Sequence, residues 1–138
     1  MKFGPSFFVM KGYNVIKIKK LRGKIVKAVS RKNAEHYNWK EICDGWHFIK
    51  SDELSVIAEK MPPYTEEDMH FHHKSKQFFY ILSGEAEMKF KDETVKLKEG
   101  TGVEVSPIEV HQMRNTSDKE IEFIVVSMPK SHGDRGLI

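Results

Sequence analysis

The chain has 138 residues, a length that favours one domain with an adequate buried core. Hydrophobic residues make up 39% of it and charged residues 31%, a balance that excludes an intrinsically disordered chain. The formal net charge of +3 is a mild excess, and the densest basic segment, residues 17–27, alternates Lys and Arg with Val, Ile and Leu. Such alternation is typical of a strand with one solvated face, so we expect no nucleic-acid partner.

The single cysteine, Cys43, excludes a disulfide within the chain and a cysteine-rich zinc site. As a nucleophile, Cys43 would need a histidine base, for which His36 and His47 are nearest in sequence, but a partly buried small side chain is the favoured interpretation. No apolar run approaches the length of a membrane span, and residues 7–10 are too short for a signal sequence. We therefore expect a cytoplasmic protein with no membrane partner.

The first 44 residues form an N-terminal arm in which β segments are predicted over residues 14–20 and 24–30. For residues 31–44 we predict a loop with a helical turn. From Trp46 onward, strands and turns alternate, and the predicted strands cover residues 46–50, 54–61, 70–73, 77–82, 86–90, 94–97, 103–106, 110–114 and 121–128. Short strands at close spacing with little helix predict an all-β sandwich or barrel.

The last segment, residues 131–136, is polar and rich in glycine. That composition is typical of a frayed terminus, the interpretation we slightly favour. The closeness of His132, Asp134 and Arg135 supports the alternative, a strap near a functional site or a contact in a dimer.

Two histidines separated by one residue, His70 and His72, stand on a predicted strand. Because side chains alternate between the faces of a strand, their imidazoles point the same way and form a pair of potential metal ligands. The carbonyl oxygen of Gln77 and a third imidazole, that of His111, can complete the set. Three histidines and one oxygen ligand suit a divalent transition metal such as Mn, Fe, Co, Ni or Zn.

These residues also carry a resemblance to a known family. The block from His70 through Gln77 to Gly84 resembles the first cupin motif, and the block from Gly100 to His111 and on to residue 115 resembles the second. The resemblance covers roughly residues 45–128.

The chain departs from the two cupin motifs at three places. Tyr64 stands where the first motif has Gly, and Gln77 stands where it has Glu. Ser106 and Ile108 replace the Pro and Gly of the second motif, with Pro107 displaced by one position. The spacing through His111 is intact, so the predicted ligand set is unchanged by these departures.

The resemblance implies an all-β fold, a double-stranded β-helix or jelly-roll cupin barrel, with an N-terminal β arm. It also implies a metal ion inside the barrel, bound by His70, His72, Gln77 and His111, and a homodimer. On this interpretation residues 1–138 form a single cupin domain with a core at roughly 45–128, an arm at 1–44 and a tail at 129–138.

The glutamine has a consequence for mechanism, because its amide neither carries a charge nor titrates. The metal would keep its full charge and prefer an anionic oxygen of a small oxygen-rich metabolite. Any catalytic base must come from elsewhere, and by strand alternation His73 and Tyr80 point away from the ligand face, while Glu104 and Glu109 are also near in sequence. No catalytic residue is therefore assigned.

Two function classes follow from this site. One is a metal-dependent isomerase, lyase or dioxygenase that acts through an enolate-like intermediate. The other is a non-enzymatic binding or sensor protein for a sugar or another metabolite, which the lack of an evident general base supports. A cupin barrel without metal is the third alternative.

Overall fold

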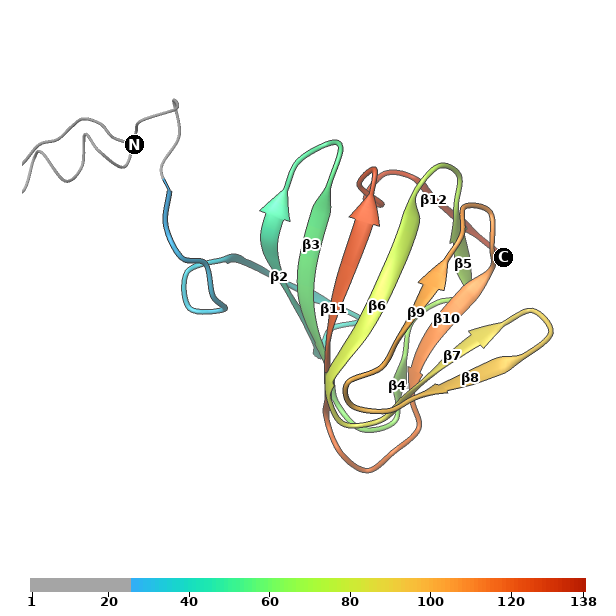
Figure 1. Ribbon diagram of the computed structural model, residues 1–138. Helices are drawn as coiled ribbons and strands as arrows, with labels where there is room; N and C mark the ends of the chain where they lie inside the picture. Colours follow the sequence, from blue (N-terminus) through green and yellow to red (C-terminus); the bar gives the residue numbers. More distant parts are fainter. Residues whose placement is uncertain (1–25) are drawn as a thin grey trace, which may run out of the picture.

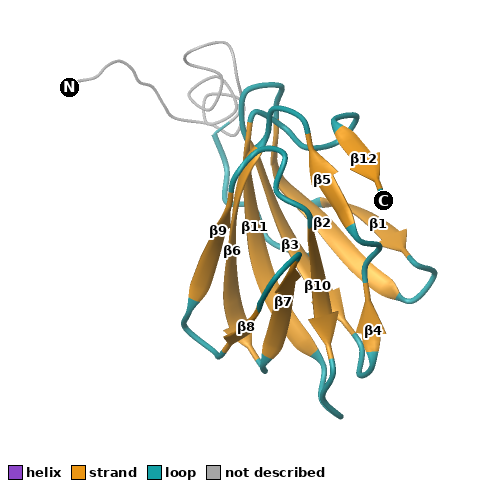
Figure 2. Ribbon diagram, turned by 90° about the vertical axis from the view of Figure 1, so that its right-hand side faces the viewer, coloured by secondary structure: helices purple, strands orange, loops and turns teal. Residues whose placement is uncertain are grey.

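The computed structural model describes residues 26–138, which fold into β-strands without a helix (Figures 1 and 2). The strands are β1 (Glu35–Trp39), β2 (Cys43–Lys50), β3 (Ser55–Met61), β4 (Thr65–Glu66), β5 (His70–His72), β6 (Lys76–Ser83), β7 (Ala86–Phe90), β8 (Thr94–Leu97), β9 (Gly102–Val105), β10 (His111–Asn115), β11 (Ile121–Met128) and β12 (Arg135–Leu137). Within these described residues no helix is long and apolar enough to cross a membrane.

The strands form two antiparallel sheets that face each other (Figure 1). One sheet has the order β1-β2-β3-β11-β6-β9, and the other has the order β12-β5-β10-β7-β8, with β4 paired to β10. Neighbours in both sheets are distant in sequence, as where β11 lies between β3 and β6. This arrangement confirms the predicted double-stranded β-helix.

Strict alternation along the strands places the core between the sheets. In β6, Phe79 and Ile81 are buried, whereas Phe78 and Tyr80 on the opposite face are 43% and 39% exposed. Residues from β7, β10 and β11 meet them from both sheets, namely Met88, Met113, Ile121, Phe123 and Val125. Because a shift by one residue would turn all these apolar side chains to solvent, the core sets the register of the strands.

Most predicted strands are confirmed, three of them to the residue: β7, β8 and β11. The prediction of a loop over residues 31–44 is wrong, because β1 forms there and pairs with β2. Lys40 and Glu41 make the turn between the two strands with φ of 51° and 68°. Positive φ is usually signalled by Gly or Asn, so this turn has no sequence signal.

The predicted N-terminal strands cannot be followed in the described part of the chain. Residues 26–30 of the predicted strand 24–30 adopt no regular structure, and the predicted strand 14–20 lies outside the described residues. The sequence resemblance placed the core of the cupin domain at residues 45–128. The two sheets also include residues before and after this range, since β1 and β12 lie outside it.

The two motif positions that lack glycine retain the backbone conformation of glycine. Tyr64 has φ of 60° and Ile108 has φ of 73°, both in the left-handed region that side chains disfavour. Both side chains are exposed, at 72% and 60%. The turn geometry is therefore retained although the residue that favours it is absent.

The chain end is not frayed, so the favoured interpretation of the tail is wrong. Strand β12 pairs antiparallel with β5, with Arg135 opposite His72 and Leu137 opposite His70. Gly136 lies under the ring of Phe71, which an added Cβ would overlap. The tail is thus a strap across the strand that carries two of the predicted ligands, as the alternative predicts.

Candidate metal centre

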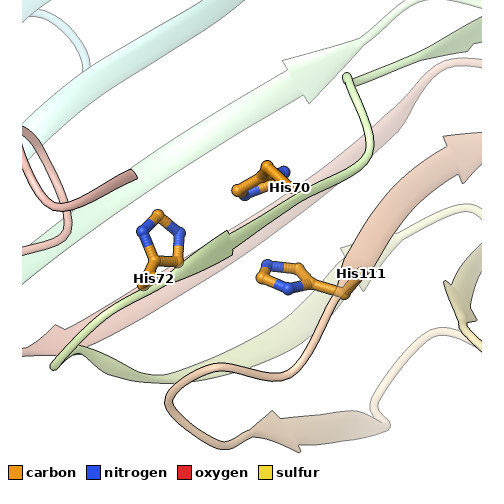
Figure 3. A group of neighbouring side chains, drawn as sticks. All are labelled: His70, His72 and His111. Carbon is orange, nitrogen blue, oxygen red and sulfur yellow. The ribbon is translucent and has the colours of Figure 1, made fainter. Parts of the chain in front are cut away.

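Strands β5 and β10 bring the three predicted histidine ligands together. His70 and His72 share the inward face of β5, and His111 at the start of β10 pairs with His70 in the sheet. One ring nitrogen from each of the three lies within 4.8 Å of the others, and all three side chains are buried. Figure 3 shows the rings converging from the two strands. The three buried histidines could hold a metal ion.

Backbone carbonyls determine which ring nitrogen of each histidine faces the site. The Nδ1 atom of His70 donates to the backbone carbonyl oxygen of Asp68 at 2.7 Å, and that of His111 donates to the backbone carbonyl oxygen of Glu109 at 2.9 Å. The Nδ1 atom of His72 donates to the backbone carbonyl oxygen of Asp134 at 3.1 Å. Because a carbonyl oxygen can only accept, each Nδ1 carries the proton and each Nε2 keeps a free lone pair.

Two of these Nε2 atoms are enclosed without a hydrogen-bond partner. Within residues 26–138, the buried Nε2 atoms of His72 and His111 have no partner. A buried polar atom without a partner is costly, and in native proteins it calls for a ligand or an ion. The donor set therefore fits a metal that binds imidazole nitrogen.

Burial keeps the three imidazoles neutral. It lowers the pKa of His70 to about 3 and that of His111 to about 4, and it also lowers the pKa of His72. The backbone bonds at Nδ1 and the neighbouring histidines act on these pKa values less strongly than burial does. At neutral pH no proton competes for the Nε2 lone pairs, which favours metal binding.

The fourth predicted ligand, Gln77, lies beside the histidines with its amide oriented by Ser127. The Gln77 Nε2 atom donates to Ser127 Oγ at 3.0 Å, and Ser127 Oγ donates to Ser131 Oγ at 3.4 Å. The buried Oε1 atom of Gln77 has no hydrogen-bond partner in the described part of the chain. The free atom is thus the carbonyl oxygen, the part of the amide that can bind a metal.

The tail holds this group of residues from the outside. The Asp134 carboxylate accepts hydrogen bonds from the backbone N–H groups of Lys74 and Ser75 at 2.8 and 2.9 Å, and from that of His73 at 3.2 Å. The Asp134 carbonyl at the same time orients His72. Ser131, at the start of the tail, ends the hydrogen-bond chain from Gln77.

A cavity of about 430 Å³ opens next to His70, His72 and Gln77, and His111 is fully buried beside it. Ile57, Phe79 and Val125 make the apolar part of its wall. The polar part comes from both sheets and includes Tyr37, Glu59, Glu67, His132 and Arg135. Cavities of this size with a few polar groups are typical of sites for small molecules.

Tyr37, Glu59 and Glu67 line this cavity although nothing in the predicted site included them. The Tyr37 hydroxyl donates to Glu59 Oε2 at 3.0 Å. Glu67 Oε1 lies 3.5 Å from His70 Nδ1, and the Glu67 side chain is only 15% exposed. One signal was available, since Glu59 stands at an inward position of β3 between Ile57 and Met61.

The carboxyl groups of Glu59 and Glu67 have pKa values well above the usual range. Burial raises the pKa of Glu59 to about 7, against the opposing effects of the Tyr37 hydroxyl and Arg135. Burial and the nearby Glu59 raise the pKa of Glu67 to about 8. Burial and Glu59 also raise the pKa of Tyr37. The pKa of Tyr37 thus moves away from neutrality, whereas those of the two carboxyl groups move toward it, which is a mark of functional sites.

The base candidates that sequence proximity suggested lie outside this cavity. The Tyr80 side chain is 39% exposed on the outer face of β6, and His73 is also exposed, as alternation predicts. Glu104 pairs with Lys76 at 3.7 Å, and Glu109 Oε1 accepts from the backbone N–H of Ser106.

Cys43 is fully buried in the core rather than partly buried, and burial raises the pKa of its thiol. Neither neighbouring histidine is engaged with it. His36 pairs with Asp44 at 2.8 Å, and the His47 ring packs against those of Tyr37 and His132. A cysteine–histidine pair is therefore absent from the described residues.

Comparison with known proteins identifies the family. The family model described as Cupin domain matches residues 58–127. This chain belongs to the cupin family. A curated relative, the protein MJ1618 of Methanocaldococcus jannaschii, is 26% identical over 93 residues, which is 67% of this chain and 74% of that protein.

Solved structures share the cupin fold at low sequence identity. A double-stranded β-helix protein from Klebsiella pneumoniae has a TM-score of 0.68 and 19% identity over 81% of this chain and 96% of its own. A predicted oxalate decarboxylase from Thermotoga maritima has a TM-score of 0.68 and 19% identity, covering 75% and 100%. The polyketide cyclase RemF from Streptomyces resistomycificus has a TM-score of 0.68 and 17% identity, covering 77% and 81%.

Proposed function

We propose that this cupin binds one divalent transition-metal ion through His70, His72, Gln77 and His111. The observation that carries the proposal is the arrangement of the imidazoles. Three neutral rings, each with Nδ1 bound to a backbone carbonyl, bring nitrogen atoms within 4.8 Å of one another in a buried site. Backbone partners of this kind orient the ligands in metal centres.

The four ligands define a class of metal rather than one element. Three imidazoles and an amide oxygen suit Zn, Ni, Fe, Mn or Co, and geometry and availability decide among these in the cell. Because all four ligands are neutral, the bound ion would act as a Lewis acid that stabilises negative charge on a ligand oxygen.

The cavity beside the site favours a small oxygen-rich metabolite as the ligand. Its volume of about 430 Å³ is typical of a site for a small molecule, and its wall combines an apolar part with carboxyl, hydroxyl and guanidinium groups. We infer that the protein is an isomerase, lyase or dioxygenase. Glu59 supports an enzyme over a sensor, because it lines the cavity with one oxygen held by Tyr37, and a carboxyl group with a pKa of about 7 suits acid–base catalysis.

We also propose that the protein is a homodimer, as the family resemblance implies. The outer face of β6 supports this proposal with a row of exposed apolar side chains at alternate positions. Phe78, Tyr80 and Leu82 are 43%, 39% and 46% exposed. Exposed apolar patches on a sheet are typical of protein–protein interfaces. A Leu82→Glu substitution should shift the protein to monomer in analytical ultracentrifugation.

Elemental mass spectrometry on untagged protein tests the metal site directly. We expect about one metal ion per chain in the wild type and a loss of most of it in His111→Ala and His72→Ala. His36→Ala is the matched control, because His36 lies on β1, pairs with Asp44 and does not line the cavity. An unchanged metal content in His72→Ala, or no uptake of metal by the wild type on reconstitution, would refute the proposal.

A further inference from the structure

Glu59 occupies a position that strand alternation reserves for the core. Ser55, Ile57 and Met61 lie on the same face of β3 and are buried. Burying a carboxyl group among such residues is costly, and a methionine or leucine would avoid that cost. Positions that break the local pattern in this way are expected at functional sites.

Tyr37 holds one oxygen of this carboxyl group and leaves the other available. The Tyr37 hydroxyl donates to Glu59 Oε2 at 3.0 Å. Within the described residues Glu59 Oε1 accepts no hydrogen bond, and Glu59 lines the cavity together with His70 and Gln77. The free oxygen belongs to a side chain of the cavity wall, where a bound molecule can reach it.

The groups that face Glu59 come from three strands and one loop. They are Tyr37 on β1, Cys43 on β2, Glu67 before β5, and Arg135 on β12. Burial outweighs the hydroxyl and the guanidinium and raises the pKa of Glu59 to about 7. Both protonation states are therefore populated near neutral pH, as a group that takes and returns a proton requires.

Arg135 indicates the charge of the ligand. It lines the cavity, and within residues 26–138 no carboxylate lies within 4 Å of its guanidinium group. A planar guanidinium without a partner at the wall of a cavity is suited to a carboxylate on the ligand. Lys40, the other cation of the wall, already pairs with Asp68 at 2.7 Å.

We propose that Glu59 transfers a proton to and from a small oxo acid whose carboxylate binds Arg135. The Glu59 carboxylate takes a proton from the carbon next to the carbonyl group. The electron pair of that C–H bond forms a C=C bond, and the carbonyl π pair moves onto oxygen. The reverse step returns the proton to carbon. This inference rests on the proposed function, since the carbonyl oxygen must lie at the three-histidine site.

Hydrogen exchange in D₂O tests this role without knowledge of the natural substrate. Pyruvate and 2-oxobutanoate serve as acidic probes and hydroxyacetone as a neutral one, with loss of the proton signal next to the carbonyl followed by NMR. The metal-loaded wild type should catalyse exchange of the oxo acids, and Glu59→Gln should slow it by about 100-fold or more. Glu122→Gln is the matched control, because Glu122 pairs with Arg31 and does not line the cavity.

Three further measurements separate a catalytic from a structural role. Arg135→Gln should raise the half-saturating concentration of pyruvate at least tenfold more than that of hydroxyacetone. Tyr37→Phe should move the pH profile of exchange to higher pH, because the hydroxyl lowers the pKa of Glu59. Glu59→Met should raise the melting temperature, whereas a structural role for the carboxyl predicts a lower one.

The outcomes distinguish this inference from the proposed function. Wild-type protein that takes up no metal would overturn the proposed function and this inference with it. Metal-loaded wild type that exchanges none of the probes would overturn this inference alone. Exchange at the wild-type rate in Glu59→Gln, or a midpoint below about pH 5 for the Glu59 carboxyl in carbon-13 NMR titration, would also overturn it.

Discussion

Replacing Asp134 by alanine should weaken metal binding although Asp134 is not a predicted ligand. Its carboxylate accepts three hydrogen bonds from the backbone of residues 73–75, at 2.8 to 3.2 Å. Asp134 is partly exposed, so we take about 1 kcal/mol for each bond, or about 3 kcal/mol in total. Without them the start of β12 is held by its backbone pairing with β5 alone, so the Asp134 carbonyl that orients the His72 ring is held less firmly.

The expected effect on metal affinity follows from the free energy of these three hydrogen bonds, which hold the tail against residues 73–75. A metal ion that binds to this loosened form must first restore the orientation of His72, and a loss of about 3 kcal/mol corresponds to at most about a 140-fold weaker affinity. Substitutions of groups that orient metal ligands typically cost about 10- to 100-fold, in agreement with this value. Competition with a chromophoric chelator measures the affinity for Zn²⁺ directly.

Two further variants test whether the loss of affinity comes from the Asp134 carboxylate. Asp92→Ala, in the exposed turn between β7 and β8, should leave the affinity unchanged. Asp134→Asn keeps an acceptor oxygen but loses the charge, so its affinity should lie between those of the wild type and Asp134→Ala. An affinity for Asp134→Ala within about twofold of the wild type would refute the coupling between tail and site, since twofold is well below about 10-fold, the lower end of the expected range.

The pH dependence of tail docking follows from the same contacts. Burial on its own would raise the pKa of Asp134, but the backbone donors of Lys74, Ser75 and His73 outweigh it and lower the pKa. A carboxyl whose pKa is lowered on docking contributes stability above its ordinary pKa of about 3.9 and loses it as pH falls through the lowered value. Docking through Asp134 should therefore be complete at neutral pH.

Further predictions concern backbone strain and acid stability. Tyr64→Gly and Ile108→Gly should each stabilise the protein by about 0.5–1 kcal/mol in urea unfolding, because glycine adopts their φ of 60° and 73° without strain. Gly84→Ala should destabilise it by about 1–3 kcal/mol in the same assay, since Gly84 has φ of 84° and an added Cβ would lie 2.8 Å from a backbone oxygen. The metal-free protein should lose stability in urea as pH falls from about 6.5 to about 4, because unfolded histidines take up protons near their ordinary pKa. In the fold, His70 and His111 remain neutral down to about pH 3 and 4, so constant stability over that range would contradict their burial.

The fold and the histidine cluster could be predicted because their signals are local. Alternation of apolar and polar residues marks strands such as β7, β8 and β11, and a spacing of one residue puts His70 and His72 on one face. Sheet pairing then decides which strands are neighbours. The antiparallel pairing of β5 with β10 brings His111 opposite His70, a contact between residues 41 positions apart that only the family resemblance anticipated.

The side of the cavity formed by Tyr37, Glu59 and the tail depends on contacts between distant parts of the chain, which local sequence patterns do not show. Strand β1 was missed because its turn uses Lys40 and Glu41 at positive φ, and Tyr37 was missed with it. The tail reads as a flexible end because its polar residues bind backbone groups near His72 instead of packing in a core. Glu59 was the exception, since a carboxyl at an inward strand position was visible in the sequence.

The proposed neutral ligand and the buried carboxyl groups suggest a division of roles. A glutamate at position 77 would bring a negative charge to a bound metal and could also serve as a base, whereas Gln77 would supply an oxygen atom and neither of these. In this chain the titratable carboxyls lie elsewhere in the wall, on Glu59 and Glu67, with pKa values of about 7 and 8. If ligand and base are separate side chains, substitution of Glu59 should abolish proton transfer and leave the metal content unchanged. In a site where one carboxylate did both, the two losses would occur together.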